Sequence, residues 1–97
     1  MLHLLAEKSV SEAVVERISA GDDVVLQSAC VWAALDGHGD NRKLASLLSK
    51  SCRVFVMRDL LEACGIAEER LLAGVVAIDY PQLVELTIDN PVIQTWC

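Results

Sequence analysis

The sequence predicts a three-layer α/β/α fold, in which helices cover both faces of a mostly parallel sheet of four or five strands. Three observations predict it. Short apolar runs bounded by turn residues alternate with segments whose apolar residues recur at helical spacing. The runs are apolar on both faces, which is typical of buried parallel strands. Connections of the length found here imply right-handed crossovers, which pack helices against the sheet.

The expected elements follow one another along the chain. Strands are expected at residues 2–6, 24–27, 54–57 and 75–78, with a short fifth strand at 92–96. Helices are expected at residues 13–18, 31–35, 44–48, 60–63 and 83–88. The loop at 36–41 splits the second connection into two short helices. This arrangement is flavodoxin-like, and residues 1–97 are expected to form one domain, because the length suffices for a single core.

The helix ends carry signals of their own. Ser9 with Glu12, and Asp59 with Glu62, have the spacing at which a cap side chain and the residue three later satisfy free backbone donors. Pro81 suits a first helical turn. Helices are expected to end near three glycines, since glycine accepts a left-handed backbone without a clash: Gly21, Gly37 and Gly65.

The composition is unusually apolar for so short a chain. Hydrophobic residues make up 54% of it, and the mean hydropathy is +0.41. A domain of this size buries only about two-thirds of the surface that its unfolded chain exposes. Some apolar side chains must therefore stay outside, and such surface usually contacts a partner. We expect an oligomer, and a hetero-oligomer in particular.

Charge and hydropathy exclude several classes of partner. The net charge of −6 argues against direct binding of nucleic acid, which needs clustered lysine and arginine. The apolar runs are far shorter than the ~20 residues of a membrane span. The opening twelve residues lack the basic leader and apolar core of a signal peptide. The expected location is the cytoplasm, with no membrane contact.

Cofactor motifs are absent from the sequence. It contains neither GxxxxGK[ST] nor a GxGxxG between the first strand and helix, so nucleotide binding is not expected. A phosphoacceptor receiver would need clustered acids after the first strand, where Glu7 and Lys8 stand instead. Four cysteines occur, Cys30, Cys52, Cys64 and Cys97, without a CxxC pair or a histidine at metal-ligand spacing. We expect no metal, no small-molecule cofactor and no structural disulfide.

Cys30 is the best candidate for chemistry. It lies in the stretch SACVWAAL, residues 28–35, at the expected start of a helix, where the dipole and free N–H groups stabilise a thiolate. Such a thiol could accept sulfur as a persulfide. The alternative is a small core residue, because cysteine is among the most buried residue types. Without a partner base in the sequence, the packing role is favoured.

Two tryptophans and one histidine each have two alternative roles. Trp32 and Trp96 are half of the four aromatic residues, and each suits either the core or an interface. Core packing is slightly favoured for both, and contact with a partner is the alternative. His3 lies within the first strand, and a hydrogen-bonded structural role is favoured over a role as catalytic base.

Several segments, taken together, resemble one family. They are MLHLL and KS at the start, VWAALDG after the second strand, RVFVMRDLLEACGI, and AIDYPQLVELTIDNPVIQTW near the end. The chain is similar to the TusB/DsrH family, the small subunit of DsrE/F/H-type sulfur-relay complexes. The resemblance spans nearly all 97 residues, and its most specific part runs from IDYPQLVELT to QTW.

The resemblance implies a function and partners. It implies a cytoplasmic heterohexamer with two copies each of this chain, a TusC/DsrF-like subunit and a TusD/DsrE-like subunit, which passes persulfide sulfur between carriers. In that family the main sulfur-carrying cysteine belongs to the TusD/DsrE-like subunit. The present chain would then be chiefly an architectural and docking partner, and hence not itself catalytic. One branch of the family serves 2-thiouridine formation at the tRNA wobble position, and another serves sulfur oxidation.

Two departures from the family pattern bear on the choice between these two branches and on the role of Cys30. Sulfur-oxidiser relatives tend to carry a cysteine in the first helix where this chain has Val14, which tilts the interpretation toward tRNA thiolation. Relatives usually have a glycine where this chain has Cys30, so Cys30 is not an inherited catalytic position. Three hypotheses stay open: an accessory subunit, a persulfide carrier that uses Cys30, and a homo-oligomer that acts alone.

Overall fold

Five parallel strands form one sheet. The computed structural model describes residues 1–7 and 9–96. The strands are β1 (Leu2–Leu5), β2 (Asp23–Leu26), β3 (Arg53–Met57), β4 (Val75–Ile78) and β5 (Ile93–Trp96). Their order in the sheet is β4-β3-β2-β1-β5, and every neighbouring pair is parallel. All five predicted strands are confirmed, as is the predicted fold class.

The order of the strands decides which face of the sheet each connecting helix covers. The chain steps from β1 to β4 one neighbour at a time, and then crosses the whole sheet so that β5 pairs with β1. This order differs from the 2-1-3-4-5 order of flavodoxin itself. The reversal of direction lies between β1 and β5. Only the last connection runs backward across the sheet, and a right-handed crossover in that direction reaches the opposite face.

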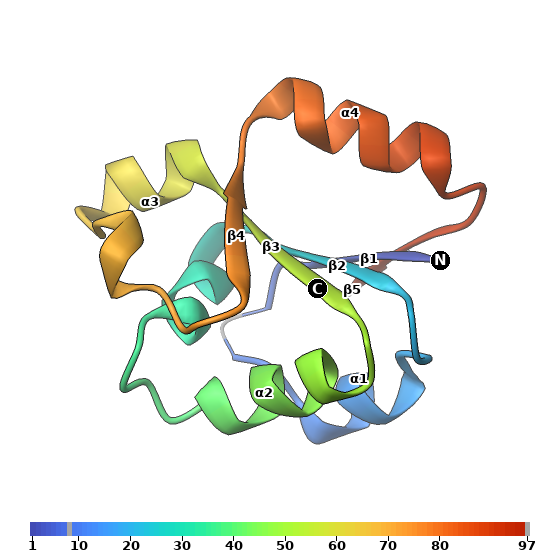
Figure 1. Ribbon diagram of the computed structural model, residues 1–97, viewed down its shortest axis with the longest axis horizontal. Coiled ribbons are helices and arrows are strands. Elements are labelled where there is room, and N and C mark those ends of the chain that lie inside the picture. The colour runs from blue at the N-terminus through green and yellow to red at the C-terminus, as the bar shows by residue number, and fades with distance from the viewer. Residues whose placement is uncertain (8, 97) are drawn as a thin grey trace.

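The helices form two layers, one on each side of the sheet. They are α1 (Glu12–Arg17), η1 (Ser28–Ala34), α2 (Asn41–Ser49), α3 (Arg58–Cys64), η2 (Glu68–Arg70) and α4 (Tyr80–Asp89). Figure 1 shows α1 and α2 together below the sheet and α4 above it. No helix among the described residues is long and apolar enough to cross a membrane.

The two faces of the sheet carry cores of unequal size. The larger cluster joins α1, η1, α2 and α3 to one face, and includes the fully buried Leu44, Leu47 and Leu26. The smaller cluster lies under α4 and consists of Leu2, Val25, Met57, Ile78 and Leu86. One helix therefore provides most of the cover on the second face.

Two of the predicted helix caps are wrong. The hydroxyl of Ser11, not Ser9, caps α1 by accepting a hydrogen bond from the Val14 N–H at 3.2 Å. Just before this cap, the Val10 N–H donates to Asp40 Oδ2 at 3.1 Å, which ties the chain that leads into α1 to the residue before α2. Asp59 is not a cap either, because β3 runs directly into α3 and leaves Asp59 inside the first turn.

The predicted place of Pro81 is confirmed, although α4 begins at Tyr80, three residues before the expected range. Pro81 lies in its first turn, and Asp79 and Gln82 form a reciprocal capping box. The Gln82 N–H donates to Asp79 Oδ1 at 3.0 Å, and the Asp79 N–H donates to Gln82 Oε1 at 2.9 Å. Gly65 ends α3 at a φ of 72°, also as predicted. Gly21 and Gly37 instead lie in turns a few residues beyond the helix ends.

Candidate functional site

Cys30 lies inside a 3-10 helix rather than at the start of an α-helix. The α-helix predicted at 31–35 is instead η1, whose bonds span three residues: Cys30 N–H donates to the Gln27 carbonyl at 3.1 Å. Ser28 begins the turn in the left-handed region, at a φ of 51°, which is uncommon for a residue with a side chain. The turn leaves Cys30 with 0% of its surface exposed.

The surroundings of Cys30 favour the neutral thiol. Burial raises the pKa of Cys30 to about 12, and the negative charges of Asp40 and Glu7 act in the same direction. A thiolate, not a thiol, is the sulfur nucleophile. The residue also packs within the larger core cluster. This geometry supports a packing role, and sulfur transfer at Cys30 would require η1 to open.

The other cysteines differ in their exposure. Cys52 is buried, and its thiol donates to the Ser19 carbonyl at 3.3 Å. Cys64 is partly exposed at the end of α3. Cys97 lies outside the described residues. Within residues 1–7 and 9–96, no three His, Cys, Asp or Glu side chains gather so that they could hold a metal ion.

Trp32 lies at the surface of η1. It is 41% exposed, although its neighbours Val31 and Ala33 are buried. The favoured prediction of core packing is therefore wrong for this residue. Its position follows the carboxyl end of β2, the edge at which ligands and partners gather in parallel sheets. Contact with a partner stays a prediction for Trp32.

Trp96 instead joins a network that ties β5 to β1. Its Nε1–H donates to His3 Nδ1 at 3.1 Å, and the two rings stack with 6.3 Å between centroids. Because Nδ1 accepts this bond, the ring proton of neutral His3 lies on Nε2 and is donated to Asp22, at 2.9 Å. The guanidinium of Arg17 lies over the indole, 5.9 Å from its centroid. The predicted structural role of His3 is confirmed.

The Trp96–His3 hydrogen bond gives a stability prediction. Trp96→Phe keeps an aromatic ring but leaves the buried His3 Nδ1 without its donor, and should lower the free energy of unfolding by about 1–2 kcal/mol. Urea unfolding would measure it. The control is Trp32→Phe at the exposed tryptophan, which should change stability by less than about 0.5 kcal/mol. Equal effects of the two substitutions would contradict the assignment.

A buried carboxylate stabilises the other face of the sheet. Asp23 on β2 accepts two hydrogen bonds from Arg53 on β3, at 2.6 and 2.7 Å, and one from the Asn90 side-chain amide at 3.1 Å. Burial alone would raise the pKa of Asp23, but these hydrogen bonds and the charge of Arg53 lower it. The amide of Asn90 also donates to the Leu86 carbonyl at 2.8 Å. The network therefore fixes the end of α4 to the middle of the sheet.

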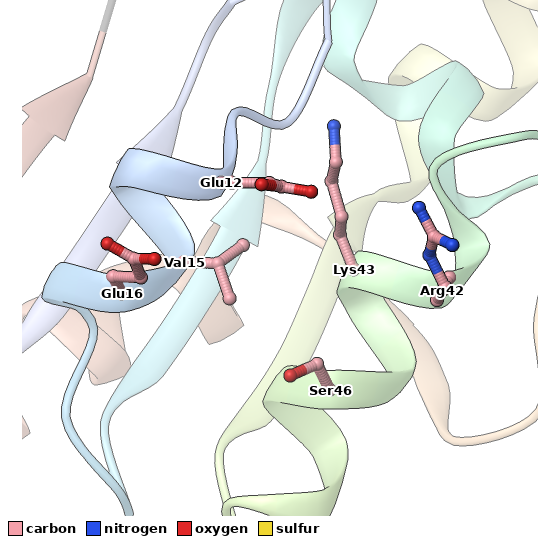
Figure 2. Close-up of a pocket in the computed structure, with 6 residues that line it drawn as sticks. All are labelled: Glu12, Val15, Glu16, Arg42, Lys43 and Ser46. Atoms are coloured by element: carbon pink, nitrogen blue, oxygen red, sulfur yellow. The ribbon is translucent and has the colours of Figure 1, made fainter.

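A groove of about 280 Å³ lies between α1 and α2. Figure 2 shows acids from α1, Glu12 and Glu16, opposite bases from α2, Arg42 and Lys43. Lys43 extends past Glu12, and its Nζ donates to the Val10 carbonyl at 2.6 Å. None of the described residues that line the groove is a cysteine or histidine. Its acidic and basic side chains suit the binding of a ligand or partner that carries both charges, rather than nucleophilic chemistry.

An apolar stripe runs along the outside of α4. Tyr80, Val84 and Ile88 are exposed, and so are Val92 and Ile93 just beyond the helix. The composition predicted that some apolar side chains would stay outside, and this is confirmed. Their location was missed, because the helical period of residues 83–88 did not show which side would meet the sheet. The repeat of apolar residues at 80, 84 and 88 was the available signal.

The fold and these sites define an all-parallel, three-layer α/β protein without a glycine-rich phosphate loop in its sequence. The model of the family described as "DsrH like protein" matches residues 6–92. The chain belongs to the DsrH family. This agrees with the resemblance drawn from the sequence.

Individual relatives agree with the family. Protein TusB of Erwinia tasmaniensis is 30% identical over 99 residues, covering 99% of this chain and all of the relative. Protein TusB of Escherichia coli K12 is 32% identical over 84 residues, 87% of this chain and 84% of the relative.

Solved structures show the same fold. The structure of ychN protein from E. coli matches with a TM-score of 0.76 at 18% identity, over 98% of this chain and 97% of that one. The protein of unknown function MTH1491 from Methanobacterium thermoautotrophicum matches with a TM-score of 0.75 at 16% identity, over 98% and 96% of the two chains.

Proposed function

We propose that this chain is an accessory, non-catalytic subunit of a cytoplasmic sulfurtransferase complex that relays persulfide sulfur. Residues 1–97 would form its one DsrH/TusB-like domain. Membership of the DsrH family supports the relay, and one observation carries the accessory role: Cys30, the best candidate thiol, is fully buried with a raised pKa. A sulfur carrier needs a thiolate that its partner can reach.

The proposed product is 2-thiouridine at the tRNA wobble position. The curated relatives are named TusB, the name that the resemblance connects with tRNA thiolation. Val14 supports this choice, because sulfur-oxidiser relatives tend to carry a cysteine at that place, whereas here it is a buried core residue. A role in dissimilatory sulfur oxidation is the second candidate. The negative net charge leaves tRNA binding to another subunit.

The proposed partners are a TusC/DsrF-like and a TusD/DsrE-like subunit, two copies of each with two of this chain. The exposed apolar residues of α4 and the exposed Trp32 support association with other proteins. Trp32 is proposed as a contact residue, whereas Trp96 would act by holding β5 in place.

Co-expression tests this function. The chain should purify in one stable complex with a TusC/DsrF-like and a TusD/DsrE-like subunit from the same organism, and the complex should support 2-thiouridine formation in a strain that lacks its own relay. Mass spectrometry of tRNA nucleosides would measure the thiolated base. A chain that elutes alone, with the other two subunits active without it, would contradict the proposal.

The rival hypothesis has its own test. If Cys30 carries sulfur, incubation of the complex with a persulfide donor should add one sulfur atom to the peptide that contains Cys30, and Cys30→Ala should abolish relay. We expect instead that Cys30→Ala supports normal thiolation, since alanine suits a small packing site. Peptide mass spectrometry and the nucleoside measurement distinguish the two outcomes.

A further inference from the structure

The outer side of α4 carries a continuous apolar stripe. Tyr80, Val84 and Ile88 are 67%, 42% and 75% exposed. Residues four apart lie one turn above another on a helix, so the three side chains share one face. Leu83 and Leu86 on the same helix instead pack into the small core beneath it. The helix is thus apolar both toward the sheet and away from it.

The stripe continues onto the edge of the sheet. Ile93 on β5 pairs in register with Leu2, whose side chain belongs to the core under α4. Register partners in parallel strands point to the same face, so Ile93 points toward the α4 side. Ile93 and its neighbour Val92 are exposed. β5 is also an edge strand of the sheet. We call Tyr80, Val84, Ile88 and Ile93 the α4 surface.

The segment of the chain that forms this surface carries acidic side chains and no basic ones. Residues 71–97 contain Asp79, Glu85 and Asp89, and no lysine, arginine or histidine. Glu85 and Asp89 are four apart and form an acidic stripe beside the apolar one. Two cationic groups lie nearby, and each contacts an aspartate. Arg53, which lines a pocket together with Glu85 and Asp89, donates from Nε and one terminal nitrogen to Asp23. The amino group of Met1 lies 3.3 Å from Asp22 Oδ1. The α4 surface is therefore apolar with an acidic border.

We propose that the α4 surface docks a companion subunit through an apolar face bordered by lysine or arginine. This rests on the proposed function, which supplies the companion subunits, and adds the surface and the chemistry of its partner. Opposite charges at the border favour that partner and raise its rate of association. A second copy of this chain would bring the same acidic border and a further net charge of −6. Anionic lipid and nucleic acid are repelled for the same reason.

Binding measurements with purified companion subunits test the proposal. Val84→Ser/Ile88→Ser should raise the dissociation constant of the complex about 30-fold, because two apolar side chains lose their burial. Glu85→Lys/Asp89→Lys should raise it about tenfold at low salt, and the difference should shrink as salt screens the charges. Because all four side chains are exposed, the variants should keep the thermal midpoint of the wild-type chain.

The matched control is Val76→Ser. Val76 is 52% exposed, against 42% for Val84, but it lies on β4 at the far edge of the sheet from β5. It should leave the complex unchanged. A wild-type complex that tolerates the α4 variants, or loses as much affinity from Val76→Ser, would overturn the docking surface while leaving the proposed function intact. If the wild-type chain forms no complex with the companion subunits, the proposed function itself is overturned. A wild-type homodimer that Val84→Ser/Ile88→Ser makes monomeric would assign the surface to a second copy.

Discussion

In the folded protein, Cys30 should react with iodoacetamide at least about a thousandfold more slowly than an ordinary exposed thiol. The pKa of about 12, in place of 9.0, leaves about a thousandth of the usual thiolate at neutral pH. Complete burial slows the reagent further, because the sulfur becomes accessible only when η1 opens. Peptide mass spectrometry over a time course would measure the rate at each cysteine.

Two internal comparisons make this result decisive. Cys64, which is partly exposed at the end of α3, should be labelled well before Cys30 in the same sample. In concentrated urea the two rates should converge, because unfolding removes the burial that separates them. Rapid labelling of Cys30 under native conditions would show that η1 opens readily, and would favour Cys30 as a sulfur carrier over the accessory role.

Arg53→Met should lower the free energy of unfolding by about 1–3 kcal/mol, since it leaves the buried Asp23 carboxylate with Asn90 as its remaining partner. The expected loss is below that of a fully buried pair because the Arg53 side chain is largely exposed. Arg58→Met is the matched control. It breaks the exposed ion pair with Glu68 and should cost much less. Urea unfolding at neutral pH would compare them.

The same carboxylate makes stability depend on pH. Hydrogen bonds lower the pKa of Asp23 in the folded protein, and those from His3 and Ser19 lower the pKa of Asp22, although burial opposes both shifts. Their contribution is therefore present above pH ~4, the pKa of an unfolded aspartate, and is lost as the pH falls through the folded values. Arg53→Met should remove most of the part that Asp23 contributes and leave the part that Asp22 contributes. If the free energy of unfolding of the variant falls with acid as steeply as that of the wild type, Asp23 is not a source of the pH dependence.

The strands could be predicted from the sequence because burial on both faces leaves a local mark. Val24 to Leu26 and Val54 to Val56 are apolar without a break, and no tertiary contact is needed to recognise them. The cap at Ser9 was wrong for the opposite reason. Asp40, thirty residues away, accepts a hydrogen bond from the Val10 N–H, and the next residue, Ser11, is the cap of α1. A local spacing rule has no access to such a contact.

Only those features of the site that depend on a residue's place along the chain could be predicted from the sequence. The sequence placed Cys30 after β2, and the structure agrees, but its burial depends on the 3-10 turn that Ser28 begins. A propensity reading favours an α-helix there. The bond between His3 and Trp96 spans 93 residues and exists because β5 returns to pair with β1. Neither side chain shows this partner in its local sequence.

The pairing of β1 with β5 joins the first strand of this sheet in chain order to the last. Until β5 has been synthesised and is free to pair, β1 can pair only with β2, and its other edge stays open. The bond from Trp96 to His3 forms only after β5 emerges. A nascent chain halted before residue 93 would therefore present an unpaired strand edge and an uncovered histidine. The last strand of the sheet thus closes the open edge of the first strand and covers its histidine.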